Sequence, residues 1–225
     1  MTSKIPPRRP RVQRRSQDTR RLILEAAGTV FANEGYAGAT LQKIQDEAGI
    51  ARGTLIHHFR SKEDLRTALL DAQVALVSAP PRECKIQEVV DMAFLFAAGL
   101  QNDPLVRGSA RLTTDGLAAG LDVNGTVHIW VAHIEGMLTQ ASEAGQLLPT
   151  VTPLEAAEAL VGAFIGTQQT SQLFDNRTRL HHRISRMWRL FLPSIVVPGM
   201  LASLDFAPDR LARMELPQPS AEPPL

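Results

Sequence analysis

Helical periodicity is the feature of this sequence that most constrains its fold. Apolar residues recur at spacings of three and four, for instance at Leu22, Ala26, Val30 and Phe31 before Gly35, as expected for the apolar face of an α-helix. The same spacing returns in later segments, and no alternation of apolar and polar residues typical of a β-strand extends beyond a few residues. The sequence therefore predicts an all-α fold.

Length and composition are those of a folded protein. The chain has 225 residues, of which 44% are hydrophobic and 21% charged, which is room for one or two domains. Its longest apolar stretch without charge or proline, residues 92–100, is far shorter than the roughly 20 residues of a membrane-spanning helix. The N-terminal segment lacks the apolar core of an export signal, and the single cysteine, Cys84, has no partner for an internal disulfide. We therefore expect a cytoplasmic protein.

Positive charge is concentrated at the N-terminus. The first 21 residues hold eight basic residues and one acidic residue, a net charge of +7, so the remainder carries −6 in a chain whose total is +1. Prolines among these arginines predict a flexible arm over residues 1–15. A basic arm on an acidic body suits a protein that meets a polyanion with one end, although a solvated tail has the same composition.

Turn and cap signals predict the domain organisation. A second helix over residues 40–48 ends at Gly49, a third covers 52–59, and Ser61 caps a fourth over 62–77, with Asp64 three residues later in a near capping-box arrangement. Apolar runs at 86–100, 105–112, 127–138, 154–174 and 184–192 follow a proline-containing linker at 78–82. We expect an arm (1–15), a three-helix helix-turn-helix domain (16–62), a second helical domain (63–213) and a disordered tail (214–225).

Residues 40–62 carry the pattern of a helix-turn-helix motif. Gly49 supplies the tight turn, and the polar face of the third helix suits the major groove of DNA. There Arg52 can pair with guanine, Thr54 can contact a thymine methyl group, and His57 can meet a base or a phosphate. We expect His58 to be partly structural. The candidate DNA-binding residues, including those expected to meet phosphates, are Thr40, Gln42, Arg52, Gly53, Thr54, His57, His58 and Lys62.

Further residues fall at the spacings of one protein family. These are Phe31, Gly35, Tyr36, Thr40, Ile44, Ala48, Gly49, Gly53, Thr54, Leu55, His58, Phe59, Ser61, Lys62 and Leu65. With them the chain resembles the TetR family of bacterial transcriptional repressors. In the second domain, Asp103-Pro104, Arg111-Leu112-Thr113, Trp130, Gly145 to Pro149, Gly162-Ala163-Phe164 and Leu192 to Leu201 resemble the γ-butyrolactone autoregulator receptors of streptomycetes and their relatives.

The resemblance implies a mechanism. It implies a homodimer that binds a palindromic operator, with half-sites about 34–36 Å apart, and that represses genes of antibiotic biosynthesis. A small diffusible signal, such as a butyrolactone, a butenolide or an antibiotic-like molecule, then fills a pocket in the second domain and releases the DNA. The fourth helix, which joins the two domains, is the expected lever.

Two positions depart from the true receptors. Ile56 stands where the family commonly has an aromatic residue, and Ile165 stands where many receptors have a threonine that hydrogen-bonds the ligand. The group also contains pseudo-receptors, which are more basic and respond to antibiotics or their intermediates, and the isoelectric point near 8.0 agrees with them. We favour a pseudo-receptor, with a true receptor as the alternative.

Pocket and dimer residues follow from helical spacing and from the resemblance. Trp130 is the first choice for the pocket because its ring offers an apolar wall and one hydrogen-bond donor. The candidate ligand-binding residues are Trp130, Thr113, Gln168, Phe94, Leu112, Ile134, Phe164 and Ile165. The dimer face is expected on the two long late helices, at Leu160, Phe164, Ser171, Trp188 and Phe191.

Other functional classes find less support. The chain has no GxSxG, GxxxxGK or HExxH motif and no paired cysteines, and neither His128 with His133 nor His181 with His182 shares a helix face as metal ligands do. We therefore expect no enzymatic activity, no cofactor and no metal. The alternative is an architectural or constitutive DNA-binding regulator without a small-molecule ligand.

Overall fold

The computed structural model describes residues 11–77, 79–118 and 124–214. These residues form helices and connecting loops, with no β-strand among them, which confirms the all-α prediction. The helices are α1 (Arg11–Gly38), α2 (Leu41–Ala48), α3 (Arg52–His58), α4 (Lys62–Leu76), α5 (Lys85–Asn102), α6 (Pro104–Ala118), α7 (Asn124–Glu143), α8 (Pro153–Asp175), α9 (Leu180–Ile195), α10 (Pro198–Leu201) and a 3₁₀ turn η1 (Arg210–Arg213).

The N-terminal helices form a helix-turn-helix domain. Near the end of α1, Gly35 has φ 70° and ψ −179°, so it interrupts the helical geometry where the sequence predicted an end. Thr40 caps α2 by accepting from the backbone N–H of Lys43 at 3.2 Å, and Gly49 makes the turn to α3 in the left-handed conformation, φ 63°. The apolar faces meet in one core, made mainly of Ile23, Ala27, Phe31, Ile44, Leu55, Phe59, Leu65 and Leu69.

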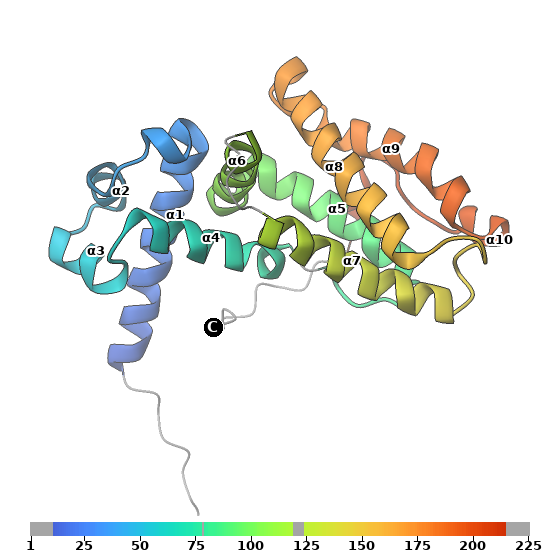
Figure 1. Cartoon of the computed structure of the whole chain (residues 1–225), viewed down its shortest axis with the longest axis horizontal. Helices are drawn as coiled ribbons and strands as arrows, with labels where there is room; N and C mark the ends of the chain where they lie inside the picture. The colour runs from blue at the N-terminus through green and yellow to red at the C-terminus, as the bar shows by residue number, and fades with distance from the viewer. Residues whose placement is uncertain (1–10, 78, 119–123, 215–225) are drawn as a thin grey trace, which may run out of the picture.

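The second domain packs around α5. This helix lies between α6, α7 and α9, and α8 runs alongside both α7 and α9 (Figure 1). Its core is continuous from Val77 to Leu204 and includes Phe94, Leu138, Leu160 and Trp188. Each large apolar side chain that is fully buried there contributes about 1.5–3 kcal/mol to folding. The helices of this domain are therefore held by packing across the bundle.

The two domains meet where α1 crosses α6 (Figure 1). Gly28 and Gly108 let the two backbones touch, and a methyl group on Gly108 would lie only 2.6 Å from the carbonyl oxygen of Gly28. Leu112 of α6 is buried in the core of the helix-turn-helix domain. The domains are thus joined by α6 as well as by α4.

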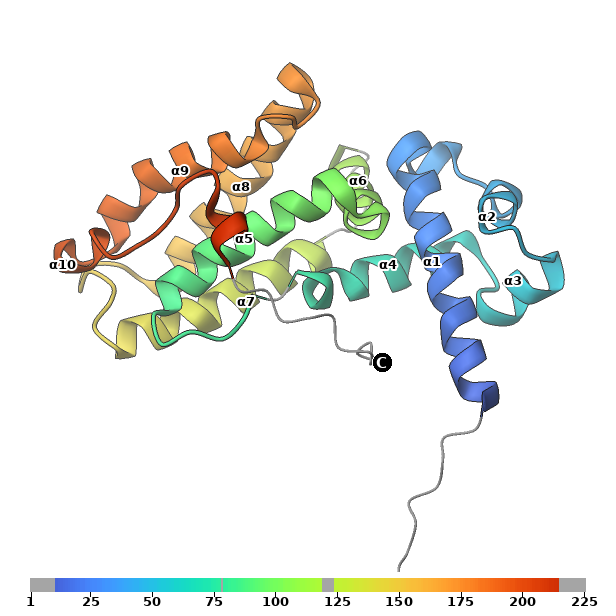
Figure 2. The same ribbon diagram turned by 180° about the vertical axis from the view of Figure 1, so that it is seen from behind.

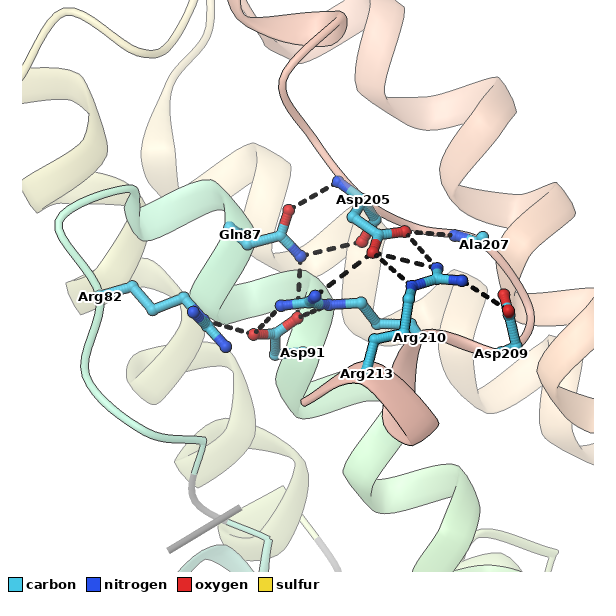
Figure 3. Close-up of polar contacts among 8 residues, drawn as sticks. All are labelled: Arg82, Gln87, Asp91, Asp205, Ala207, Asp209, Arg210 and Arg213. Carbon is cyan, nitrogen blue, oxygen red and sulfur yellow. Dashed lines mark hydrogen bonds and ion pairs between the residues drawn. The ribbon is translucent and has the colours of Figure 1, made fainter. Parts of the chain in front are cut away.

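A buried ion-pair network fastens the C-terminal segment to α5 (Figures 2 and 3). Asp91, fully buried on α5, accepts from Nε and Nη2 of Arg210 at 2.8 and 3.0 Å and from Nε of Arg82. Gln87 donates to the carbonyl of Asp205 at 2.9 Å and accepts from its N–H at 2.8 Å. Because Arg82 follows α4, one carboxylate holds both the inter-helix linker and η1.

The ends of the chain only partly test the expected tails. Helix α1 begins at Arg11, so residues 11–15 are helical and the prediction of a flexible arm is wrong for them. Residues 1–10 and 215–225 lie outside the described residues. No helix within the described ranges is long and apolar enough to cross a membrane.

Candidate DNA-reading and effector sites

Helix α3 carries a buried face and an exposed face. Leu55 and the C-cap residue Phe59 are buried in the core, while Arg52 and Gly53 are exposed and Thr54 is half-buried. Arg52 is the first residue of the helix. The N-terminal half of α3 is thus free to enter a major groove, as a recognition helix does.

The two histidines of α3 have different surroundings. His57 is exposed and His58 is half-buried, with their rings edge to face and their centroids 5.2 Å apart. Burial lowers the pKa of His58, and the positive charges of His57 and Arg20 lower it further. His57 is therefore the better placed of the two to meet DNA.

Lys62 holds helices together. Its ammonium donates to the carbonyl oxygens of Tyr36 at 2.7 Å and Ala39 at 2.9 Å and lies 4.2 Å from the centroid of the Tyr36 ring. These carbonyls belong to the end of α1, where backbone acceptors lack helical partners. Two of its three donors are thus used inside the domain, so Lys62 has a structural role, and its contact with a phosphate stays a prediction.

Thr40 and Gln42 remain exposed at the start of α2. Thr40 is occupied as the N-cap, and Nε2 of Gln42 donates to Asp46 at 2.8 Å. Backbone N–H groups at a helix start favour phosphates. Contact of these two residues with DNA stays a prediction.

The junction between α3 and α4 contains the predicted capping box. The N–H of Asp64 donates to Oγ of Ser61 at 3.0 Å, and Oδ2 of Asp64 accepts from the N–H groups of Ser61 and Arg60 at 3.2 and 2.9 Å. These hydrogen bonds lower the pKa of Asp64. They fix the start of α4 directly behind the recognition helix.

An apolar cavity of about 100 Å³ lies inside the second domain. The Trp130 ring stands edge-on to Phe96, with centroids 5.3 Å apart, and Phe96 stands edge-on to Phe164 at 5.2 Å. Six of the eight candidate ligand-binding residues line the cavity, namely Trp130, Thr113, Gln168, Ile134, Phe164 and Ile165. Helical spacing and the resemblance therefore located most of the candidates correctly, and these six are one third of the 18 lining residues.

Two candidates lie elsewhere. Phe94 is fully buried in the core of the second domain and stacks on His181, with centroids 6.1 Å apart. Leu112 is buried against the helix-turn-helix domain. Neither lines the cavity, so both predictions are corrected: these residues belong to packing cores.

Two residues of the cavity wall each have a buried polar atom without a partner among the described residues. Gln73 of α4 is only 3% exposed and Trp188 of α9 only 2%, yet Oε1 of the first and Nε1 of the second make no hydrogen bond. Buried polar atoms normally find a partner. An occupant that donates to Gln73 and accepts from Trp188 would satisfy both.

Gln73 was missed by the sequence analysis although a signal existed. Leu65, Leu69, Gln73 and Val77 follow one another at intervals of four and are all buried. A glutamine in this otherwise apolar row of α4 indicates a polar function. Gln73 brings the fourth helix into the wall of the cavity.

Most of the residues expected in the dimer interface point into the protomer. Leu160, Ser171 and Trp188 are buried inside the protomer, and Phe164 lines the cavity. Phe191 is half-buried against the core. The periodic stripe is therefore mainly the inner face of α8 and α9, and the interface prediction is corrected for Leu160, Ser171 and Trp188; for the half-buried Phe164 and Phe191 it stays a prediction.

The outer face of the same helices is free. Leu173 on α8 is 83% exposed and Leu190 on α9 is 77% exposed. Gly162 and Gly166 are exposed on α8, and a methyl group on either would meet nothing within 4 Å. Large apolar side chains beside small residues leave a face on which another helix pair can pack closely.

Comparisons with known proteins decide the family. Residues 23–69 match the model described as bacterial regulatory proteins of the tetR family, and residues 83–198 match the tetracyclin repressor-like C-terminal domain. The chain belongs to the TetR family. Because TetR proteins are DNA-binding regulators and not enzymes, the enzyme interpretation is excluded.

Relatives of this TetR chain agree with the resemblance in its sequence. It is 32% identical to the A-factor receptor protein of Streptomyces griseus over 195 residues, which is 85% of this chain and 69% of that protein. The structure of TylP, a TetR regulator from Streptomyces fradiae, is 36% identical, with a TM-score of 0.81 over 87% of this chain and 95% of TylP. A γ-butyrolactone receptor described as ArpA-like shares the fold, with a TM-score of 0.70 at 24% identity over 88% of this chain and 98% of the receptor.

Both residues that depart from the receptor pattern occupy informative places in this TetR chain. Ile56 is exposed on α3 and adds no polar group there. Ile165 lines the cavity and leaves that part of the wall apolar.

Proposed function

We propose that this TetR-family chain represses transcription as a homodimer on a palindromic operator in the cytoplasm and leaves the DNA when a small, largely apolar signal occupies the cavity. The course of α4 is the observation that carries the proposal. This helix begins at the Ser61 and Asp64 cap behind α3, and about three turns later its Gln73 lines the cavity (Figure 1). One helix therefore connects the DNA-reading element with the effector site.

The size of the cavity supplies the direction of the switch. About 100 Å³ is less than the roughly 300–1,000 Å³ of sites for drug-sized ligands. A drug-sized effector has to displace the helices that line the cavity, including α4 and α6. Such an effector therefore binds better to a conformation in which the cavity is larger. Differential affinity of this kind is what shifts an equilibrium, and a 100-fold loss of operator affinity needs a coupling of about 2.7 kcal/mol.

The lining indicates the class of effector. Apolar side chains, four of them aromatic, favour a mostly hydrocarbon molecule, and the unpartnered atoms of Gln73 and Trp188 favour one donor and one acceptor on it. The names of the relatives support a butyrolactone-type signal and a role in secondary metabolism. Ile165, where many true receptors carry threonine, supports the interpretation as a pseudo-receptor, in which the signal is an antibiotic or its intermediate.

The homodimer is proposed on the outer face of α8 and α9. Gly166→Arg adds a long charged side chain at a position where a methyl group meets nothing within 4 Å, so the protomer still folds. We expect this variant to be monomeric by light scattering and to lose operator binding. Gly136→Arg, at an exposed position of α7 with equal space, is the control. A dimer of unchanged stability in Gly166→Arg would refute this face.

The effector site is tested by the loss of Trp130. Operator fragments selected from random DNA by the purified protein are titrated by fluorescence anisotropy, and a panel of butyrolactones, butenolides and antibiotics is screened for release. Trp130→Ala keeps operator affinity and loses release, because the ring lines the cavity far from α3. Ile129→Ala, exposed on the same helix and outside the cavity wall, keeps both.

The same assay separates the alternatives. An architectural or constitutive binder shows operator binding that no compound reverses in either variant. A Trp130→Ala protein that releases the operator normally would show that the effector binds elsewhere.

A further inference from the structure

Arg177, in the turn after α8, lies close enough to Arg107 and Arg111 of α6 for their charges to act on it, and Gln101 at the end of α5 donates to its carbonyl oxygen. Arg107 and Arg111 lie one helical turn apart on α6, and Arg177 follows the C-cap of α8. Nε of Arg111 pairs with Asp115 at 2.7 Å. Among the residues that the structure describes, no carboxylate lies within ion-pair distance of Arg107 or Arg177.

Both of these arginines bury a donor that has no acceptor. Nε of Arg107 and Nε of Arg177 are inaccessible to solvent and make no hydrogen bond to any described residue. No acceptor among the described residues replaces the hydration that these two atoms lose by burial. A buried charged donor without a partner is expensive for a folded protein, which indicates that a further group belongs there.

Electrostatic repulsion among these arginines also favours a bound negative group. Burial lowers the pKa of Arg177, and the positive charges of Arg107 and Arg111 lower it further. Like charges are thus held together on a partly dry surface. A negative group beside them would remove the repulsion.

Two carboxylates close to these arginines in the sequence have other partners. Asp175 accepts from Arg183 at 2.9 Å and from Ser171 at 3.0 Å. Asp103, one turn before Arg107, accepts from the N–H of Leu105 at 2.8 Å. Neither forms an ion pair with Arg107 or Arg177 in this arrangement.

The backbone holds Arg177 in place at a cost. Asn176 and Arg177 both have positive φ, 50° and 63°, a conformation uncommon for residues other than glycine. Two contacts fix the turn: Gln101 donates to the carbonyl of Arg177 at 2.6 Å, and Nη2 of Arg177 donates to Gln168 at 2.8 Å. Its guanidinium is therefore pre-positioned.

We propose that Arg107 and Arg177 form a binding site for a small oxyanion, a carboxylate or a phosphate group. Planar guanidinium groups match the paired oxygens of such anions. The site stands apart from the proposed function, but Gln168 links the two because it accepts from Arg177 and lines the cavity. If the effector binds in the cavity as proposed, the anion site is adjacent to the bound effector.

Isothermal titration calorimetry of the full-length protein tests the site. Inorganic phosphate is titrated at constant ionic strength into the wild type, Arg107→Gln, Arg177→Gln and the control Arg179→Gln, an exposed arginine of the same turn. We expect saturable binding that is about tenfold weaker, or about 1.4 kcal/mol, in the first two variants and unchanged in the control. Absence of saturable binding, or equal binding in all four proteins, would overturn the proposal.

Thermal unfolding distinguishes a binding site from a structural cluster. In chloride buffer both glutamine variants unfold at or above the wild-type temperature, because a repulsive charge has been removed, and phosphate raises the midpoint of the wild type alone. A midpoint that falls in both variants without phosphate would show that the arginines stabilise the fold by themselves, and would contradict the proposal.

A carboxylate probe identifies the source of the anion. Benzoate and benzyl alcohol are compared in the wild type and in Trp130→Ala. If the anion is the head of a molecule in the cavity, benzoate binds more tightly than phosphate and loses affinity in Trp130→Ala. If it is a free anion, benzoate and phosphate bind alike in both proteins. Failure of every compound to release the operator leaves these measurements unaffected.

Discussion

Gly28 on α1 and Gly108 on α6 touch through their backbones. A methyl group on Gly28 would lie 2.6 Å from the carbonyl oxygen of Pro104, and one on Gly108 would lie 2.6 Å from the carbonyl oxygen of Gly28. No side chain separates the helices at this crossing. Thr113 of α6 also lines the cavity. A displacement of α6 at the cavity therefore moves α1 as well, because the two backbones are in contact.

Gly108→Ala tests this crossing. The added methyl group meets backbone atoms that cannot rotate away, so we expect a loss of about 1–3 kcal/mol in the free energy of unfolding, measured in urea. Gly136→Ala is the matched control, because its methyl group meets nothing within 4 Å on α7, and it gains up to about 1 kcal/mol from helix propensity. Equal effects of the two changes would refute the close contact.

Asp91→Asn tests the network of Figure 3. Removal of the charge leaves Arg210 with a buried guanidinium that is only partly compensated by Asp205. We expect a loss of about 3–5 kcal/mol in unfolding free energy. Asp209→Asn, whose carboxylate is 67% exposed, changes it by less than about 0.5 kcal/mol. A mild effect of Asp91→Asn would mean that the C-terminal segment detaches at little cost.

Tyr36→Phe changes the acid dependence of stability. The hydroxyl of Tyr36 donates to Glu63 at 2.7 Å and, with Arg66, lowers the pKa of that carboxyl below its ordinary 4.5. A depressed pKa contributes stability that is complete above pH 4.5 and is lost as pH falls through the folded-state value. The Glu63 side chain is 54% exposed, so we expect only about 0.5 kcal/mol.

The measurement is urea unfolding between neutral pH and the acid limb. Tyr36→Phe keeps the ring next to Lys62 and reduces the dependence of the unfolding free energy on pH in the acid range. Glu63→Gln reduces this dependence to at least the same extent. An unchanged slope in Tyr36→Phe would show that Arg66 alone sets the pKa.

Arg52→Ala and Lys62→Met separate base reading from structure. Arg52 is exposed at the start of α3. We expect its loss to weaken the binding free energy for the specific operator by about 1–3 kcal/mol and to relax the preference for one base. Lys62→Met removes two hydrogen bonds to carbonyls and lowers unfolding free energy by about 1–3 kcal/mol. The salt dependence of operator binding stays the same. A slope reduced by about one in Lys62→Met would show that Lys62 also contacts a phosphate.

Local signals in the sequence were sufficient for the helix-turn-helix. Gly35, Thr40, Gly49 and the pair Ser61 and Asp64 each act through neighbouring backbone groups, so their roles follow from spacing alone. The same holds for α4 and α8, whose ends lie within one residue of the predicted ones.

Long-range contacts explain what the sequence left open. Periodicity tells which face of α8 is apolar but not what covers it, so Leu160 was assigned to an interface although it lines the protomer's own cavity. On α5, Phe94 and Phe96 are two positions apart and point to different neighbours, His181 and Trp130. Only the assembled bundle determines which of them meets a ligand.

The ammonium of Lys62 joins the start of α4 to the end of α1 through two hydrogen bonds. Helices α1 to α4 of the helix-turn-helix domain therefore form one rigid unit. Under the proposed function, a unit of this kind leaves its operator by moving as a whole, with its internal structure preserved. Hydrogen exchange within the unit is then indifferent to the signal. Evolution can therefore retune what the regulator senses while the set of genes under its control stays the same.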